Sequence, residues 1–189
     1  MGGAALVVIA LILQWMLNPD IGVVNWSLRG AGLIDESIYW LATPSMAMLS
    51  TIALNVWKYT PFVTICVLAR LQTIPLELYD AAKVDGAGPW ASFRNVTLPM
   101  ISPVLFYNVI IALIAAFQYF TQAYVVSNGR GDPDRATLFF NLDLYREAFG
   151  FYHMGYASAM AWLLFVIVLG LTIVLFKTAG SWVFAGGER

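Results

Sequence analysis

Long apolar runs alternate with short polar connections along this 189-residue chain. A helix that crosses a bilayer needs about 20 mostly apolar residues. Four runs approach or meet that length, and together they predict an all-α fold: a polytopic membrane helix bundle of about four transmembrane helices. The predicted spans cover residues 2–17, 46–71, 101–126 and 156–176.

The first run is shorter than the others, and no charged residue precedes it. A secretory signal would carry a basic region ahead of its apolar core, so residues 2–17 are not predicted to be a signal peptide. We expect instead that the chain begins partway through a helix and that preceding spans are missing. Residues 1–189 would then form a single membrane domain that is incomplete at its N-terminus.

The first and last connections predict surface turns and short helices. Residues 18–45 contain Asn-Pro-Asp and several glycines, which favours turns followed by a short interfacial helix at about residues 38–41. Residues 127–155 begin with SNGRGDPDR, which indicates a loop, and continue with LFFNLDLYREAF, which predicts a short amphipathic helix at the membrane surface.

The middle connection, residues 72–100, is charged, broken by glycine and bounded by prolines. Pro75 suits the first turn of a helix, Gly86 a left-handed position that ends it, and Pro89 the start of a second helix. Pro99 and Pro103 are expected to flank the entry to the next span. Acids near the positive end of the first helix and a lysine near its negative end fit the macrodipole. These residues are Glu77, Asp80 and Lys83.

This two-helix elbow cannot bury its apolar side chains alone. Tyr79, Trp90 and Phe93 therefore need a partner surface, or the elbow rests on the bilayer as an amphipathic loop. The adjacent Ala81 and Ala82 favour close contact with protein, because small side chains do not anchor a loop in lipid.

Composition places the chain in the membrane. It is 60% hydrophobic and 11% charged, with a mean hydropathy of +0.75, whereas a soluble domain carries about 25% charged residues. A net charge of −1 offers no basic footprint for nucleic acid. The single Cys66 excludes an intrachain disulfide, and the single His153 argues against a histidine-based metal site.

Lysine and arginine leave the orientation nearly open, because they divide almost evenly between the two sides that four spans define. One side holds Lys83, Arg94, Lys177 and Arg189, with Arg70 at its edge, and the other holds Arg29, Arg130, Arg135 and Arg146.

No catalytic motif occurs in the sequence. The Gly-x-x-x-x-Gly-Lys-Ser/Thr phosphate loop is absent, and so are the Gly-x-Ser-x-Gly elbow and the His-Glu-x-x-His pair. We therefore expect no catalytic residue, no metal, no cofactor and no ATP hydrolysis by this chain.

Two polar stripes within the spans are candidates for a solute pathway. A polar group facing lipid is unfavourable, so each stripe should face a cavity or, alternatively, hydrogen-bond to another helix. The third-span stripe consists of Asn108, Ala112, Ala115, Tyr119 and Gln122. The second-span stripe consists of Thr51, Asn55 and Lys58, next to Trp57, whose carbonyl Pro61 leaves without a helix donor.

Lys58 lies near the centre of a predicted span, where insertion costs roughly 2.5–3.5 kcal/mol. Three explanations stay open: it lines a watery cavity, meets an acid on a partner subunit, or reaches outward to the interface. On the fourth span, Ala157 and Ala161 form a small-xxx-small pair that predicts helix packing.

The middle connection resembles the coupling loop of binding-protein-dependent ABC importer permeases. The stretch ELYDAAKVDGAGPWASFRNVTLP follows the Glu-Ala-Ala…Gly pattern of that family, with Asp80 where glutamate is usual. The matching positions are Asp80, Ala81, Ala82, Asp85, Gly86, Ala87, Phe93, Leu98 and Pro99, with Glu77 also inside the loop.

Further segments resemble the maltose-type carbohydrate subfamily. They are WMLNPDIGVVN, VWKYTPF, LQTIPLELYDAA and LYREAFGFYHMGYASAMAWLLF, and the ending SWVF resembles the first of the two permeases in such importers. The resemblance covers essentially the whole chain, although such permeases have six or more spans.

The resemblance implies a function and a set of partners. The chain would be a permease subunit that moves a sugar or related polyol by alternating access across the cytoplasmic (inner) membrane of a prokaryote. Its partners would be a pair of cytoplasmic ABC ATPases, a second homologous permease and an extracytoplasmic solute-binding protein. Residues 72–100 would form a cytoplasmic two-helix coupling loop, with both chain termini on the same side.

Two alternatives are kept beside this interpretation. A stand-alone secondary transporter or channel would need intramembrane acids or an internal repeat, and the sequence shows neither. A non-transporting permease fragment is consistent with the short first run.

Overall fold

The computed structural model describes residues 3–183 and is entirely helical among its regular elements. The chain divides into two compact units, residues 1–57 with 116–164 (unit 1) and residues 58–115 with 165–189 (unit 2). Both chain termini lie outside the described residues, and so do Arg189 and the last residue of the SWVF motif. The side of the membrane on which the termini lie therefore stays a prediction.

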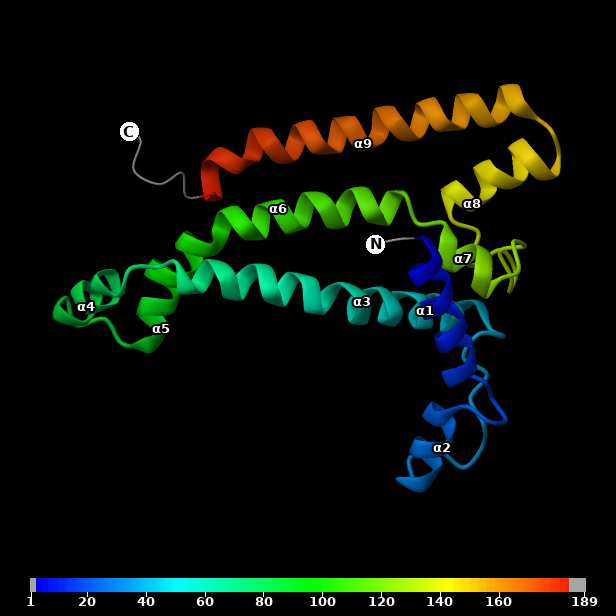
Figure 1. The fold of residues 1–189 in the computed structure, drawn as a ribbon, viewed down its shortest axis with the longest axis horizontal. Helices are drawn as coiled ribbons and strands as arrows, with labels where there is room; N and C mark the ends of the chain where they lie inside the picture. The colour runs from blue at the N-terminus through cyan, green and yellow to red at the C-terminus, as the bar shows by residue number, and fades with distance from the viewer. Residues whose placement is uncertain (1–2, 184–189) are drawn as a thin grey trace. The chain divides into compact units, whose positions relative to one another are not determined.

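The helices are labelled in Figure 1. They are α1 (Gly3–Met16), α2 (Val23–Gly30), α3 (Pro44–Gln72), α4 (Leu76–Val84), α5 (Pro89–Ser92), α6 (Leu98–Phe117), α7 (Thr121–Val126), α8 (Phe140–Tyr145) and α9 (Met154–Trp182), with π-helical turns η1 (Phe93–Thr97) and η2 (Arg146–Gly150).

The predicted helical membrane fold is confirmed. Within the described residues, three helical stretches are long and apolar enough to cross a bilayer: Pro44–Gln72, Pro89–Val126 and Met154–Gly180. The first predicted span is a shorter apolar helix, α1, of 14 residues. Asn18 follows it, and its Oδ1 accepts hydrogen bonds from the N–H groups of Asp20 and Ile21, which turns the chain away from the helix axis.

The third predicted span, residues 101–126, lies within the apolar stretch Pro89–Val126, but its helix is interrupted near the end. α6 ends at Phe117, and α7 begins at Thr121 after Phe120, whose backbone angles (φ −138°, ψ −64°) are neither helical nor extended. The break is stabilised by burial of Tyr119, whose ring packs edge-on against that of Phe139 at 4.8 Å between centroids.

The short helix predicted at residues 38–41 is wrong, and the helix of this connection lies earlier, at α2. Asn25 from α2 bonds one backbone group that a helix at residues 38–41 would use, the carbonyl of Ile38. Its Nδ2 donates to the carbonyls of Pro19 (3.2 Å) and Ile38 (2.9 Å), and its Oδ1 accepts from Trp40 Nε1 (2.9 Å).

Unit 1 is built around α1, α7 and α8. Gln14 on α1 donates from Nε2 to the carbonyls of Val125 (3.1 Å) and Val126 (3.0 Å) at the end of α7. Tyr119, Ala123 and Leu142 form a small buried core. The loop and the short helix predicted in residues 127–155 are both observed, the helix as α8 and η2, and the place of this helix at the membrane surface stays a prediction.

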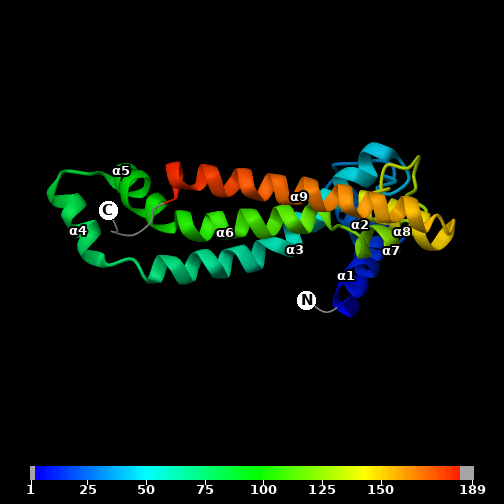
Figure 2. The same ribbon diagram turned by 90° about the horizontal axis from the view of Figure 1, so that it is seen from above.

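Unit 2 holds residues 58–72 of α3, most of α6 and residues 165–182 of α9, which run side by side in Figures 1 and 2. The rings of Phe106 and Phe176 join α6 to α9 edge-on at 5.3 Å. Arg70 Nε donates to the carbonyl of Met100 at 2.9 Å and joins α3 to α6. The connection between these last two helices carries the candidate coupling site.

Candidate functional site

The elbow after α4 has the backbone geometry of a Schellman helix end. Gly86 adopts the left-handed conformation (φ 77°), as the sequence predicts. The N–H of Ala87 donates to the carbonyl of Ala82 (2.9 Å), and that of Gly86 to Lys83 (3.0 Å), which is the bond pair of this motif. Pro75 sits one position before α4, and Pro89 is the first residue of α5, where its missing N–H costs nothing.

The second arm of the elbow is continuous with the following span. α5, η1 and α6 follow one another without a break, so Pro99 and Pro103 lie inside the helix and do not flank its start as the sequence suggests. Pro103 cannot donate to the carbonyl of Pro99, and the Ser102 hydroxyl donates to it instead at 2.7 Å. The π turn η1 closes with the N–H of Leu98 on the carbonyl of Phe93.

The two arms are joined by a side-chain hydrogen bond that sequence reasoning missed. Tyr79 Oη on α4 lies 2.9 Å from Thr97 Oγ1 on η1. The two residues are 18 positions apart, so no local sequence pattern predicts their contact. The only hint in the sequence is that each of the two arms carries a hydroxyl group. On the outer surface of α4, Lys83 Nζ and Asp80 Oδ1 form the ion pair expected of i,i+3 neighbours, at 2.9 Å.

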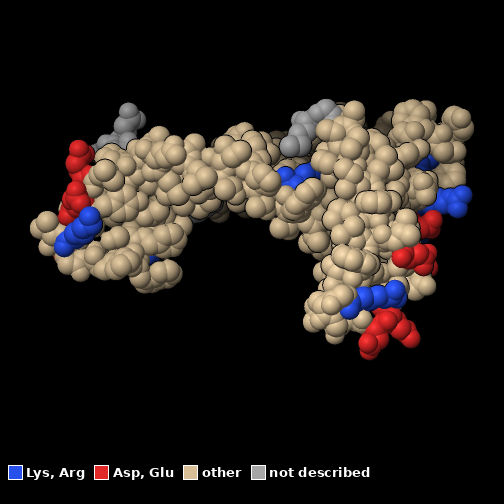
Figure 3. Space-filling model, turned by 60° about the horizontal axis from the view of Figure 1, so that its bottom comes forward, with Lys and Arg blue, Asp and Glu red and all other residues tan. Residues whose placement is uncertain are grey.

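The elbow leaves large apolar side chains in the open. Leu76 is 77% exposed, Val84 87% and Trp90 73%. The ring of Trp90 stacks on that of Phe93 at 5.6 Å, so the second arm presents a flat aromatic surface. Figure 3 shows acidic and basic side chains gathered over the α4 end, whereas the face of the long helices in that view is nearly uncharged.

Most of the predicted coupling residues are accessible. Ala82, Ala87 and Pro99 are partly buried, and the rest are exposed: Glu77, Asp80, Ala81, Asp85, Gly86, Phe93 and Leu98. The structure therefore brings the motif residues together on one elbow whose outer surface mixes acids, small residues and apolar side chains. This combination suits a protein partner better than lipid alone, because carboxylates would be unfavourable in the hydrocarbon.

The six predicted pathway residues are divided between the two units. Asn55, Trp57, Tyr119 and Gln122 belong to unit 1, and Lys58 and Asn108 to unit 2. The expected single helix face from Asn108 to Gln122 is wrong, because α6 ends before Tyr119. Trp57 is 65% exposed, and Lys58 Nζ lies 4.5 Å from the ring centroid of its neighbour Tyr59.

Two of these side chains carry buried amide atoms without a hydrogen-bond partner. Asn108 Nδ2 donates to Val104 O within its own helix at 2.8 Å, while its Oδ1 is buried and unpaired. Gln122 Nε2 is likewise buried and unpaired. By contrast, Asn55 is partly buried and donates to Thr51 O at 2.9 Å. A buried polar atom without a partner is costly and rare, which singles out Asn108 and Gln122.

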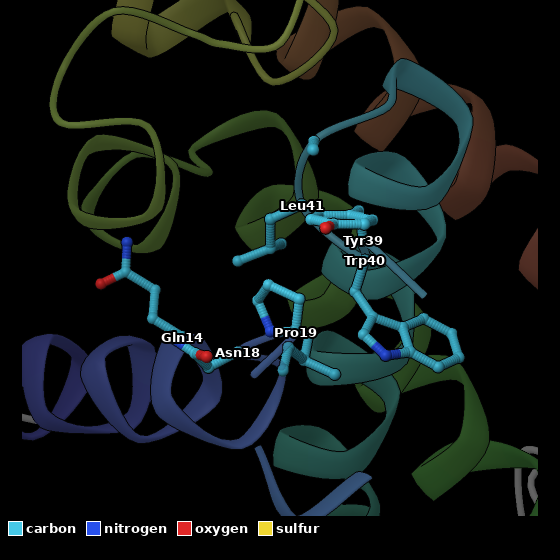
Figure 4. A pocket seen from close by; sticks show the side chains of 8 residues that line it. Gln14, Asn18, Pro19, Tyr39, Trp40 and Leu41 are labelled. Carbon is cyan, nitrogen blue, oxygen red and sulfur yellow. The ribbon is translucent and has the colours of Figure 1, made fainter. Parts of the chain in front are cut away.

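A cavity of about 310 Å³ lies in unit 1 where α1 meets residues 39–42 (Figure 4). Its lining combines the end of α1 with aromatic and polar side chains: Gln14, Leu17, Asn18, Pro19, Tyr39, Trp40, Leu41 and Ala42. Several polar groups in this lining are already engaged, since Gln14 Nε2, Trp40 Nε1 and Asn18 Oδ1 make the internal bonds described above. We therefore interpret the cavity as a gap in the packing between α1 and the connection that contains α2, and not as a solute-binding site.

Comparison with known proteins places the chain in a family. Residues 5–182 match the family described as "Binding-protein-dependent transport system inner membrane component". The chain is 41% identical over 176 residues to a probable ABC transporter permease protein, YesP, of Bacillus subtilis, covering 93% of this chain and 56% of that protein.

It is 39% identical over 167 residues to the trehalose/maltose transport system permease protein MalF of Thermococcus litoralis, covering 87% of this chain and 54% of that protein. The chain thus spans about half the length of the curated relatives it matches.

The fold also matches a solved structure. That structure is a bacterial alginate ABC transporter in complex with an alginate pentasaccharide-bound periplasmic protein, at a TM-score of 0.77 and 26% identity. The match covers 92% of this chain and 59% of that one. By the family match over most of its length and by these relatives, the chain belongs to the inner membrane components of binding-protein-dependent transport systems, the ABC importer permeases.

Proposed function

We propose that this chain is the membrane-spanning part of an ATP-driven importer of a sugar or related polyol, and that it works by alternating access. The chain would conduct the solute and leave ATP hydrolysis to a separate subunit. The observation that carries this proposal is the elbow of α4 and α5, which displays the coupling motif on an exposed surface next to two long apolar helices.

The elbow is suited to receive a push from a partner. Leu76, Val84 and Trp90 offer apolar area for burial, and the acids around them limit the partner to a surface with complementary charge. The Tyr79–Thr97 hydrogen bond and the continuous second arm make the elbow move with α6. A pair of ABC ATPases is the proposed partner, so the elbow would lie in the cytoplasm.

The solute class is inferred from the relatives. Their names refer to trehalose and maltose, diacetylchitobiose, and lactose. The unpaired amide atoms of Asn108 and Gln122 support a polar, uncharged solute. Asn108 Oδ1 could accept a hydrogen bond from a solute hydroxyl group, and Gln122 Nε2 could donate one to it. Asn55, Trp57, Lys58 and Tyr119 remain further proposed pathway residues.

The remaining partners follow from the same family. A second homologous permease would complete the pathway, and an extracytoplasmic binding protein would deliver the solute. In support, the similar alginate transporter is solved in complex with a periplasmic protein that holds an alginate pentasaccharide. The chain would then lie in the inner membrane of a prokaryote, with the α2 connection and residues 127–153 on the side away from the ATPases.

Capture of the ATPase tests the coupling role. The ATPase of the same transport system would be pulled down with the membrane-inserted chain carrying either Gly86→Pro or Gly88→Ala. Proline fixes φ near −65° and cannot adopt the +77° of Gly86, so this change should abolish capture. Gly88 has φ −71° and open space around its Cβ position, so its alanine variant is a matched control that should capture normally.

Equal capture by wild type and Gly86→Pro would refute docking through the elbow. Failure of all three proteins to capture the ATPase would contradict the proposed partnership itself. Membrane insertion of each variant is checked by fractionation, so that loss of capture is not confused with loss of the protein.

A further inference from the structure

Four exposed aromatic residues gather where η2 leads into α9. Phe149 is 58% exposed, Phe151 53%, Tyr152 76% and Tyr156 60%. They occupy the end of η2, the bend after it and the first turn of α9. Such a concentration of open rings needs a covering medium, because exposed aromatic surface is costly in water.

The backbone holds the most exposed ring in an unusual conformation. Tyr152 has φ 60°, the left-handed region that glycine usually occupies at a helix end and that is unfavourable for a bulky residue. The N–H of Phe151 donates to Arg146 O (2.9 Å) and that of His153 to Glu147 O (2.8 Å), so the bend is well defined. Backbone conformation therefore does not explain why this position holds a tyrosine, so the explanation must lie in what its side chain contacts.

The bend is also braced by side chains. His153 Nδ1 lies 2.8 Å from Glu147 Oε2, and the carbonyl of His153 accepts the N–H of Ala157 at 3.0 Å as α9 begins. The bend that carries the aromatic residues is thus hydrogen-bonded to η2 on one side and to α9 on the other.

The length of α9 indicates what covers these rings. Its 29 residues extend about 43 Å at 1.5 Å per residue, against roughly 30 Å of hydrocarbon and 40–45 Å with the headgroups. A helix of this length, centred on its apolar part, has its ends at headgroup level. None of the residues in its most apolar stretch is buried within the described structure, so lipid can reach its sides.

Aromatic rings prefer this depth, since their apolar bodies enter the hydrocarbon boundary while polar edges stay hydrated. Arg146, whose guanidinium lies 5.8 Å from the ring centroid of Phe151, adds a cation at the level of the lipid phosphates. We propose that Phe149, Phe151, Tyr152 and Tyr156 form an interfacial anchor that seats in the phospholipid headgroup region and fixes the depth of α9. This proposal requires a membrane but not the transport function.

A spin label can measure the depth of the anchor directly. The natural Cys66 is first replaced by alanine, and a nitroxide is attached at Tyr152→Cys or, separately, at Asp134→Cys. Asp134 is a matched control in unit 1, because it is also exposed and left-handed (φ 45°) but polar. The full chain is reconstituted in vesicles of phosphatidylethanolamine and phosphatidylglycerol, and relaxation by oxygen is compared with relaxation by a water-soluble nickel chelate.

The anchor predicts an oxygen-to-nickel ratio several-fold higher at position 152 than at position 134. A label at Tyr156→Cys, one helical turn further on, should give a still higher ratio and serves if the first variant misfolds. A ratio at 152 and 156 equal to that at 134 would overturn the proposal. Protection of both positions from both reagents would also overturn it, in favour of a protein surface covering the rings.

Discussion

Two connections of similar length join the long helices, and they are stabilised in opposite ways. The elbow between α3 and α6 is shaped by backbone geometry at Gly86 and by prolines at its helix starts, and its side chains point outward. The connection between α1 and α3 is shaped by one buried side chain, Asn25, which is 3% exposed and bonds three other groups. The first arrangement frees its surface for a partner, and the second uses its polar residues internally.

The comparison predicts its largest effect at Asn25. Replacing it by leucine removes three hydrogen bonds and deprives the carbonyl of Ile38 and the indole N–H of Trp40 of this partner, while the carbonyl of Pro19 keeps its bond from Ser37 Oγ. The expected cost is roughly 2–4 kcal/mol in the free energy of unfolding. Denaturation in detergent micelles would measure the loss. The matched control is Ser27→Ala on the same helix, which removes only an exposed bond to Val24 O and should change little. A small effect of Asn25→Leu would show that this side chain does not stabilise the connection between α1 and α3.

Gly86→Ala should have the next largest effect. Alanine must adopt φ 77° there, which costs about 1–2 kcal/mol or displaces the elbow, although nothing lies within 4 Å of the added methyl group. Gly88→Ala should be neutral or slightly stabilising in the same denaturation assay. Equal effects of the two changes would show that the left-handed turn does not shape the elbow.

Loss of the bond between the elbow arms should matter less. Tyr79→Phe removes the hydroxyl from Thr97 and should cost about 1 kcal/mol, because the pair is partly buried. A cycle with Thr97→Val separates this bond from the loss of either hydroxyl alone, and the two changes together should cost less than their sum. Strict additivity would mean that the arms are not joined through this pair.

The smallest effect is expected at the ion pair of Asp80 and Lys83, because both side chains are 70% exposed. Lys83→Met should change the free energy of unfolding by roughly 0.5 kcal/mol or less, and salt should reduce the difference further. A larger, salt-independent loss would indicate that the outer face of α4 is stabilised by charge, contrary to the comparison.

The same contrast explains what the sequence could predict. Gly86, Pro75 and Pro89 act through their own backbone preferences, so the elbow could be derived from local rules. The Asn25 network joins residues 13 and 15 positions apart through side chains, and no periodic pattern marks such pairs. For this reason the helix at α2 was missed and one was expected at residues 38–41.

The break after Phe117 escaped prediction for a related reason. Residues 118–126 contain no proline or glycine, so the local signal favours an unbroken helix. Tertiary burial of Tyr119 against Phe139 decides the outcome, and these rings are 20 positions apart in the chain. The prolines in α6 gave the reverse error: they were expected to flank the helix, but η1 and the Ser102 hydroxyl accommodate them inside it.

In the proposed coupling role, the unbroken course from α5 through η1 into α6 would make this segment a lever. By the helical rise it is about 40 Å long, so a tilt of about ten degrees at the elbow would displace its far end by roughly 7 Å. The helical hydrogen-bond ladder of this segment is irregular at the π turn beside Pro99 and again at Pro103, which lacks an N–H. In that role, the length of this segment and the positions of its irregular turns would determine how far a movement of the elbow carries along α6.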